Sequence, residues 1–320
     1  MRLLSTINFI RFKILYISSK YRWLERNLTG KDKETTYEHL IGMVSNELRN
    51  YCYKYGKEIY TGEGALIDLG SWLGSSVIPL ASGLNENPLA NNAKIHAYDA
   101  FVWYDNMTYS AKNTSIKNKY KTGDDFLPEF EGQTHAYRDY IITHKGDLRN
   151  VEWNGEAIEY LFIDAMKDWD VTLQILNTFY TKLIPGKSII IHEDFCHHYT
   201  SWIHIIHYRL SDYFTPTNAL KNSSEMVFLN TKPLPNLEHF FPEQFEKISQ
   251  EEIEAAFNYS LSLVGKSNKP AILAAKAMAY RHIGHYTKAK KTIAQIPFIY
   301  KHLNREVFDA LMQIHRECKD

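Results

Sequence analysis

The chain has 320 residues, with 37 basic and 37 acidic residues, so its formal net charge is zero. This balance argues against nucleic acid as a partner, because proteins that bind duplexes usually carry a basic surplus. A hydrophobic content of 44% is enough for a packed core, and the three cysteines show no spacing typical of a disulfide framework or a zinc site. The composition predicts one large α/β domain with a smaller appendage, in a reducing compartment such as the cytoplasm.

Residues 1–58 are predicted to form a helical N-terminal region. The first part is apolar, but basic residues such as Arg11 and Lys13 interrupt the run, which argues against a spanning helix and a secretory signal. A basic amphipathic helix here would touch an anionic membrane surface, pack on its own domain, or join a second subunit in a homo-oligomer. Over residues 34–57, apolar side chains recur at helical intervals and predict an amphipathic helix.

Short apolar runs, several of which end in an acidic residue, predict a series of buried strands alternating with helices. The strands are expected at 65–70, 94–99, 140–144, 159–164 and 188–194, followed by an antiparallel pair near 213–218 and 225–229. Helices are expected from residue 77 and over 171–179 and 202–210. This alternation predicts a Rossmann-like, doubly wound seven-stranded α/β sheet, with its last strand antiparallel, in a domain of residues 59–235.

Two segments lie outside this alternation. Residues 101–138 are rich in aromatic side chains and fit no simple crossover helix; an insertion of this length is usually functional or disordered, and we interpret it as a cover over the substrate. Residues 236–320 are predicted to form an α-helical C-terminal region, within which 275–290 resemble a single tetratricopeptide unit. One such unit cannot bury its own face, so it should stack on flanking helices.

A glycine-rich loop follows the first predicted strand and reads Asp68-x-Gly70-x-x-x-Gly74-x-Ser76, with Ser71 after the first glycine. Gly70 allows a tight turn, Gly74 would let a ligand approach the main chain, and the helix start offers unpaired N–H groups. An acid directly before the loop would repel a pyrophosphate, whereas it suits a cationic sulfonium that carries an amino-acid end. The missing Gly-x-Gly-x-x-Gly spacing also argues against a hydride-transferring dehydrogenase.

Two further acids end the next two predicted strands. Asp99 is placed where a carboxylate can accept ribose hydroxyls, and Asp147 follows Gly146 beside the expected adenine. Each feature alone could be ordinary turn or packing chemistry, but the ordered set resembles the class I S-adenosylmethionine-dependent methyltransferases over residues 60–230. That resemblance implies that Asp99 binds the ribose of the cofactor and that Asp147 lies near its adenine. The methionine part would be held by the loop residues Asp68, Gly70, Ser71, Gly74 and Ser76.

Three carboxylates follow the fourth and fifth predicted strands: Asp164, Glu193 and Asp194. In a parallel sheet these strand ends are neighbours on the edge that carries the glycine loop. Clustered carboxylates repel one another unless a cation lies among them, and hard oxygen ligands suit Mg²⁺ or Mn²⁺. The alternative is that the acidic pair caps a helix.

The stretch Asp164-Ala-Met-Lys167-Asp168 resembles the catechol and caffeoyl-CoA O-methyltransferases, which implies a metal ligand and a lysine base. The acidic pair at 193–194, with the preceding Leu183-Ile-Pro-Gly-Lys, is more similar to the macrocin-type sugar O-methyltransferases, although those enzymes usually carry histidine where Lys167 stands. The alternative for Lys167 is a surface lysine paired with Asp168.

Histidines and tryptophans flank the acidic cluster. Strand alternation predicts that His192 points into the packing of the sheet, whereas His197 and His198 should line the substrate mouth, with His197 as an alternative catalytic base. Trp169 and Trp202 are candidate contacts to the acceptor.

The sequence thus predicts a methyltransferase that uses S-adenosylmethionine and a divalent metal to methylate a hydroxyl. The acceptor would be a small molecule or glycan with a vicinal diol (a sugar or glycosylated metabolite) or a catechol. Two alternatives stay open: a metal-independent N- or O-methyltransferase, and a non-catalytic scaffold that binds a partner through its helical tail.

Overall fold

The computed structural model describes residues 37–217, 220 and 223–317. The predictions made for residues 1–36, including the membrane-contacting helix, therefore lie outside the described residues. Within the described part of the chain, no helix combines the length and apolar character needed to cross a membrane.

Seven strands form one sheet in the order β3-β2-β1-β4-β5-β7-β6. Strands β1 to β5 pair in parallel, and β7 is antiparallel to both of its neighbours. This arrangement confirms the predicted doubly wound sheet with an antiparallel last strand. The strands are β1 Ala65–Leu69, β2 Ile95–Asp99, β3 Ile141–Lys145, β4 Ile158–Ile163, β5 Ile189–His192, β6 Phe214–Pro216 and β7 Met226–Asn230.

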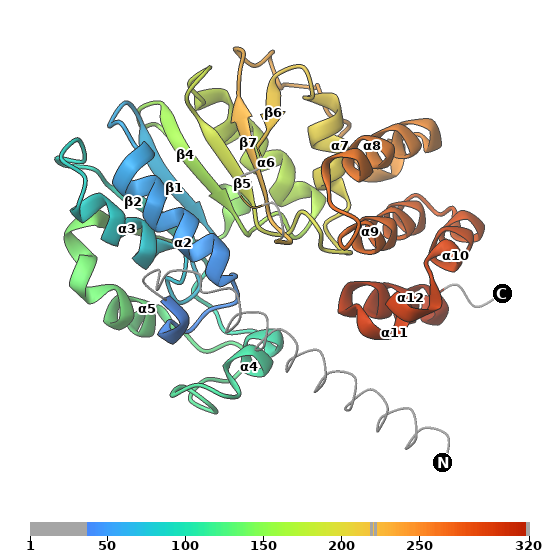
Figure 1. Ribbon diagram of the computed structural model, residues 1–320, viewed down its shortest axis with the longest axis horizontal. Coiled ribbons are helices and arrows are strands. Elements are labelled where there is room, and N and C mark those ends of the chain that lie inside the picture. Colours follow the sequence, from blue (N-terminus) through green and yellow to red (C-terminus); the bar gives the residue numbers. More distant parts are fainter. Residues whose placement is uncertain (1–36, 218–219, 221–222, 318–320) are drawn as a thin grey trace, which may run out of the picture.

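Helices cover both faces of the sheet and continue beyond it (Figure 1). Those that flank the sheet are α2 Asn46–Lys54, α3 Val77–Asn85, α6 Trp169–Phe179 and α7 Trp202–Arg209. The insertion contributes α4 Asp105–Ala111 and α5 Leu127–Thr134. The C-terminal region contributes α8 Gln250–Leu263, α9 Lys269–His282, α10 Tyr286–Gln295, α11 Phe298–Leu303 and α12 Arg305–Glu317.

The helix predicted over 34–57 is shorter in the structure. Its main part, α2, begins after Ser45, whose side chain accepts a hydrogen bond from the backbone N–H of Leu48. Such a cap fixes where the helix begins, because it satisfies a backbone N–H that has no partner within the helix. Only a short 3₁₀ turn, Tyr37–His39, precedes it among the described residues.

Strand β4 shows how the two faces of the sheet are buried. Tyr160 and Phe162 pack into one cluster with α2, α3 and the insertion, whereas Leu161 and Ile163 pack into the other with α6, α7 and the C-terminal helices. Side chains alternate across a strand, so a strand covered on both faces reads as a continuous apolar run. This is the signal that located β4 in the sequence.

The C-terminal helices belong to the same hydrophobic cluster as one face of the sheet. Phe257 of α8 and Ala275 of α9 are fully buried in that cluster, together with Ile206 of α7. Helices α9 and α10 form a hairpin that turns at Gly284, which has a φ of 75°. The predicted helical tail is therefore packed against the sheet's own helices, as Figure 1 shows.

The insertion is ordered and has its own apolar centre. Trp103 and Phe126 are buried, and Val102 pairs with Asp125 in an isolated antiparallel bridge. Helices α4 and α12 both lie below the sheet in Figure 1, and the guanidinium of Arg305 stands 5.5 Å from the ring centre of Tyr109. The insertion and the C-terminal region thus approach each other on one side of the sheet.

Candidate active site

The glycine loop lies between the ends of β1 and β4. Gly70 has a φ of 91°, and a Cβ built on it would lie 2.6 Å from the backbone oxygen of Asp164. Both facts require glycine, since the left-handed conformation and the close approach each penalise a side chain. The turn that starts the predicted cofactor loop is therefore in contact with the first predicted metal ligand.

Asp68 fixes this loop from within. Its carboxylate is fully buried and accepts hydrogen bonds from Ser71 Oγ at 2.6 Å and Ser76 Oγ at 2.7 Å. Burial raises the pKa of Asp68 to about 6, although the two hydroxyls oppose the rise. Three of the predicted cofactor residues thus form one hydrogen-bonded unit that sets the shape of the loop.

Gly74 also has a left-handed conformation, with a φ of 80°. A Cβ there would lie 2.8 Å from Cγ2 of Thr134 in α5. We expected a ligand to approach the main chain at this glycine, whereas the structure places the insertion against it. The requirement for glycine here comes from the backbone conformation and from packing against α5.

Asp99, at the end of β2, accepts hydrogen bonds from the backbone N–H groups of Trp72 and Phe101, at 2.9 and 2.7 Å. Burial raises its pKa, and these backbone donors oppose the rise. Trp72 has a φ of 38°, and its buried ring lies 6.1 Å from that of Trp103. Sequence reasoning missed Trp72, although a bulky aromatic residue inside a glycine-rich loop was a visible signal.

Asp147 caps the short turn Leu148–Asn150 by accepting a hydrogen bond from the backbone N–H of Arg149 at 2.9 Å. It also pairs with the guanidinium of Arg149 at 3.1 Å. A cavity of about 280 Å³ opens beside it, lined in part by Tyr98 and His144. Asp147 is therefore the predicted cofactor residue that borders a cavity at the end of β3.

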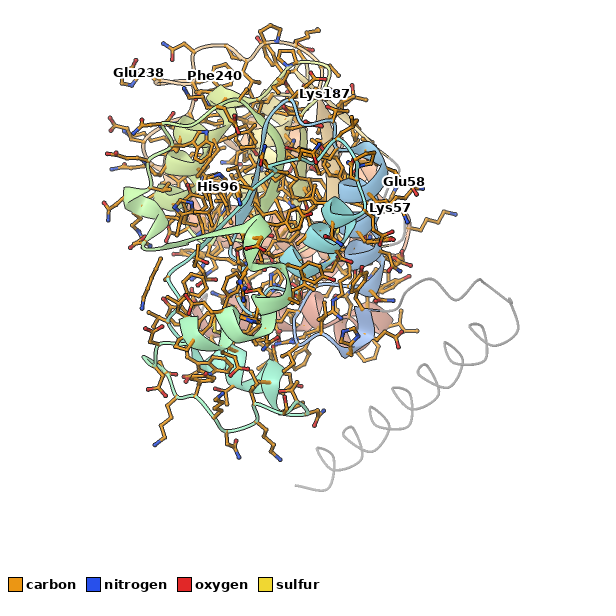
Figure 2. All side chains as sticks on the ribbon, turned by 90° about the vertical axis from the view of Figure 1, so that its left-hand side faces the viewer. Lys57, Glu58, His96, Lys187, Glu238 and Phe240 are labelled. Carbon is orange, nitrogen blue, oxygen red and sulfur yellow. The ribbon has the colours of Figure 1, made fainter. Side chains whose placement is uncertain are left out.

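Stacked rings form one wall of this region. The rings of Tyr98 and His144 lie 4.2 Å apart and nearly parallel, and His144 Nε2 lies 2.9 Å from Nδ1 of His96. His96 is half-buried, and Figure 2 labels it away from Lys57, Glu58 and Lys187. Burial lowers the pKa of His96 to about 4, so this stack is uncharged at neutral pH.

The three predicted metal ligands meet at the carboxyl ends of β4 and β5. Asp164 and Glu193 directly follow Ile163 and His192, which are paired in register. One carboxylate oxygen from each of Asp164, Glu193 and Asp194 lies within 4.8 Å of the others. Burial, followed by the charges of its two neighbours, raises the pKa of Glu193 well above its usual range. Carboxylates this close repel one another, so the charged form of one of them is disfavoured unless a cation offsets it.

Lys167 supplies a cation to this cluster. Its Nζ lies 2.5 Å from Asp164 Oδ1 and also contacts Asp194. Burial acts to lower the pKa of Lys167, but the two carboxylates raise it well above its usual range. The side chain of Asp168 instead accepts a hydrogen bond from the backbone N–H of Val171 at the start of α6. The structure thus separates Lys167 from Asp168 and directs it into the acidic cluster.

His192 is fully buried, and its Nε2 lies 3.0 Å from the hydroxyl of Tyr180. It points into the packing of the sheet, as alternation predicted. His198 Nδ1 lies 2.6 Å from Glu306 Oε2, and His197 Nδ1 lies 3.1 Å from the same atom. Glu306 belongs to the first turn of α12, so a residue from the C-terminal region reaches the loop after β5. Sequence reasoning missed it because no local pattern marks a contact across 108 residues.

The two tryptophans proposed as acceptor contacts are structural. Trp202 donates a hydrogen bond from Nε1 to the backbone oxygen of Met166 at 2.8 Å, and Trp169 donates to that of Pro242 at 2.9 Å. Both are buried in the cluster that includes α6 and the C-terminal helices. The prediction was wrong because their indole N–H groups are satisfied inside the core.

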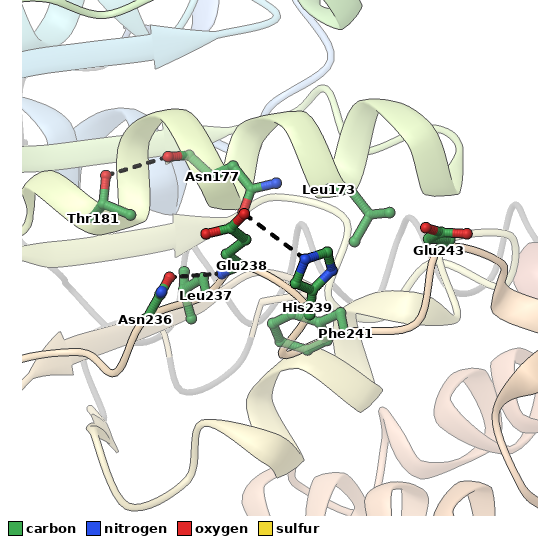
Figure 3. Close-up of a pocket in the computed structure, with 9 residues that line it drawn as sticks. All are labelled: Leu173, Asn177, Thr181, Asn236, Leu237, Glu238, His239, Phe241 and Glu243. Carbon is green, nitrogen blue, oxygen red and sulfur yellow. Dashed lines mark hydrogen bonds and ion pairs between the residues drawn. The ribbon is translucent and has the colours of Figure 1, made fainter.

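Another cavity lies away from these residues. It has a volume of about 430 Å³ and is lined by α6 and the segment 236–243 (Figure 3). Figure 3 shows His239 and Glu238 at its mouth, with Leu173 on the opposite helix. None of the predicted site residues lines this cavity. This cavity is therefore separate from the predicted site.

Neither a protein-family model nor a curated protein sequence matches the chain. In structure, the chain is similar to the O-methyltransferase NovP, with 13% identity and a TM-score of 0.45, covering 60% of this chain and 83% of that one. It is also similar to coclaurine N-methyltransferase bound to N-methylheliamine and SAH, with 12% identity and a TM-score of 0.29, covering 74% of this chain and 66% of that one. At such low identity, the strand order and directions carry the assignment to the seven-stranded Rossmann-like fold.

Proposed function

We propose that this chain is an S-adenosylmethionine-dependent methyltransferase. The observation that carries the proposal is the meeting of a hydrogen-bonded glycine loop and a cluster of three carboxylates at one edge of the sheet. In open α/β sheets, ligands bind outside the carboxyl ends of the strands, where the strand order reverses. The loop from Gly70 to Ser76 would hold the methionine part of the cofactor, Asp99 the ribose and Asp147 the adenine.

We further propose that the acidic cluster binds Mg²⁺ or Mn²⁺. Three carboxylates within reach of one ion are the hard oxygen donors these ions prefer, and they leave coordination positions for substrate oxygens. The raised pKa of Glu193, caused by burial and its acidic neighbours, supports a demand for cation charge. A bound ion would lower the pKa of a coordinated hydroxyl.

The residues of the chain then divide the remaining work. A cation held by the carboxylates would displace the Lys167 ammonium from its ion pairs and lower its pKa. Lys167 would then accept the proton of the acceptor hydroxyl at Nζ as the neutral amine, and His197 is the alternative base. The resulting oxygen forms a bond to the methyl carbon as the bond from that carbon to sulfur breaks, and positioning by the loop supplies much of the rate. A vicinal diol of a sugar or glycosylated metabolite, or a catechol, offers two adjacent oxygens to such a site.

A metal-independent N- or O-methyltransferase is the second candidate, and one observation favours it. The ammonium of Lys167 already lies between Asp164 and Asp194, so the chain provides its own counter-ion. Under this alternative the acidic cluster is structural, and a chelator leaves methyl transfer unchanged. In either case we propose that residues 59–235 form the catalytic unit and that residues 236–320 form one wall of the site.

The first experiment is titration calorimetry of the full chain with S-adenosylhomocysteine, with Mg²⁺ and then with a chelator. We expect micromolar binding by the wild type and a loss of at least about tenfold in Asp99→Asn, since one hydrogen bond to a charged group is worth about 1.5–3 kcal/mol. Asp139→Asn is the matched control, because the Asp139 side chain is 92% exposed. Unfolding curves of both variants show whether the fold is intact.

Screening for transfer then follows, with methyl-labelled cofactor and a panel of diols and catechols. Transfer that stops with the chelator and returns with Mg²⁺ supports metal dependence, whereas transfer that ignores the chelator supports the second candidate. A folded wild type that fails to bind S-adenosylhomocysteine would overturn the proposal in favour of a scaffold role.

A further inference from the structure

A second cluster of metal-ligating side chains lies next to the acidic one. The loop after β5 provides His197 and His198, and the first turn of α12 provides Glu306. One potential ligand atom from each lies within 4.8 Å of the other two. The cluster joins the loop that carries Glu193 and Asp194 to the C-terminal region.

Three nitrogen atoms of His197 and His198 lie close to one oxygen of Glu306, but not all of them form a hydrogen bond with it. Its Oε2 accepts the backbone N–H of His198 at 3.0 Å and lies 2.6 Å from His198 Nδ1. The same oxygen is 3.1 Å from His197 Nδ1, yet this buried nitrogen makes no hydrogen bond of acceptable geometry to any described residue. One carboxylate oxygen has two lone pairs, and both are used by the two nitrogens of His198. His197 Nδ1 therefore lies close to this oxygen without a lone pair to which it could donate.

Both sides of the cluster are held in place by other contacts. The backbone N–H of His197 and the hydroxyl of Thr200 both donate to the backbone oxygen of Asp194, each at 2.9 Å. On the other side, the backbone N–H of Val307 donates to Asn304 Oδ1 at 3.2 Å at the start of α12. Ligands that are fixed in this way lose little freedom when an ion binds.

We infer that His197, His198 and Glu306 form a binding site for Zn²⁺. Two imidazole nitrogens and one carboxylate oxygen, with a fourth position left open, are a typical ligand set for this ion. Imidazole does not suit Mg²⁺, which prefers oxygen, so the two neighbouring clusters differ in the metal they select. The inference goes beyond the proposed methyl transfer and does not depend on it. If His197 binds zinc, Lys167 is the remaining candidate for the base.

The site needs a small adjustment to accept the ion. Ligand atoms about 2.0–2.1 Å from a four-coordinate Zn²⁺ stand roughly 3.3 Å apart, so the 2.6 Å separation of His198 Nδ1 and Glu306 Oε2 would have to widen. The Glu306 side chain is 23% exposed, so this widening needs a shift of the side chain while the backbone contacts of the loop and of α12 are kept. The ion would then fasten α12 to the loop that follows β5, and so position the wall of the site.

The test is zinc binding by the full chain with the acidic cluster saturated by Mg²⁺. We expect one equivalent of zinc to remain after dialysis, and Co²⁺ to give the visible absorption of a four-coordinate site. Glu306→Gln, His197→Ala and His198→Ala should each weaken zinc by more than about 100-fold, beyond the loss expected for an outer-shell partner. Glu306→Gln keeps a side-chain oxygen that accepts the His198 N–H, so it separates loss of the ligand charge from loss of the fold.

Two controls keep the result specific. His315→Ala removes an exposed histidine from the same helix, and Asp164→Asn removes a ligand of the acidic cluster; both should retain zinc. The inference is overturned if folded wild type binds no zinc, if Asp164→Asn abolishes zinc binding, or if Glu306→Gln binds zinc as tightly as wild type. Circular dichroism of each variant confirms that the comparison is made between folded proteins.

Discussion

The two halves of the sheet edge both bury carboxylates, but they balance that charge differently. At the ends of β1 and β2, Asp68 and Asp99 accept hydrogen bonds from serine hydroxyls and backbone N–H groups. At the ends of β4 and β5, three carboxylates face one another, and among the described residues the cation that contacts them is Lys167.

This difference assigns different tasks to the two halves. A buried acid that accepts hydrogen bonds from fixed donors is largely satisfied and stiffens its loop. Three acids that share one ammonium instead repel one another, and this repulsion adds to burial in raising the pKa of Glu193. We therefore expect the first half to fix the shape of the cofactor loop, and the second half to be where a cation would bind. Substitutions that remove the cation, the contact between the halves or the buried acid should break this comparison in different ways.

The largest effect is expected for Lys167→Met, which keeps the length of the side chain and removes its charge. Methyl transfer should fall by about 10²–10⁴-fold, the usual contribution of a general base, while Mg²⁺ should bind more tightly because no ammonium competes for Asp164 and Asp194. Transfer rates and titration calorimetry measure the two effects. Lys182→Met, at an exposed position, is the control, and weaker Mg²⁺ binding in Lys167→Met would contradict competition.

The next effect concerns Gly70, where the two halves touch. Gly70→Ala should lower the free energy of unfolding by about 3–5 kcal/mol, because backbone strain adds to the clash with Asp164. Gly123→Ala is a matched control, since Gly123 has a similar φ of 96° and no atom within 4 Å of its Cβ position. It should lose only about 1–2 kcal/mol. If urea unfolding shows that both variants lose the same free energy of unfolding, the close contact between Gly70 and Asp164 does not add to the cost of the substitution.

The smallest effect is the pH dependence of Asp68→Asn. Burial raises the pKa of Asp68 to about 6 in the folded state, so the folded protein holds this proton more tightly than the unfolded chain. The contribution of Asp68 to stability is therefore fully present below about pH 4 and is lost as the pH rises through 6. Asp68→Asn should remove this dependence and gain up to about 2–3 kcal/mol at pH 7 relative to its effect at pH 4.

Chemical denaturation of both proteins from pH 4 to pH 7 measures that difference. Asp139→Asn, at an exposed carboxylate, should run parallel to wild type over the same range. If the free energies of unfolding of wild type and Asp68→Asn also change in parallel with pH, the serine hydroxyls fully offset the effect of burying the charge. The variant should still bind the cofactor more weakly, since its loop loses the anionic acceptor of Ser71 and Ser76.

The sequence predicted the sheet well because each parallel strand is a short apolar run between polar turns. Asp164 and Glu193 were placed on one edge from that pattern alone, and the structure brings them together. What the pattern could not supply were contacts set by tertiary packing. Lys167 turns away from its neighbour Asp168, and Trp72 occupies the glycine loop, because the ends of other strands provide their partners.

Glu306 has a consequence for the order in which the site is assembled during synthesis. It follows His198 by 108 residues, and all seven strands precede it in the chain. At a translation rate of roughly 5–20 residues per second, this interval lasts roughly 5–20 seconds. A nascent chain can therefore complete its sheet before Glu306 has been synthesised. The contact between α12 and the loop after β5 is then the last part of the site to form.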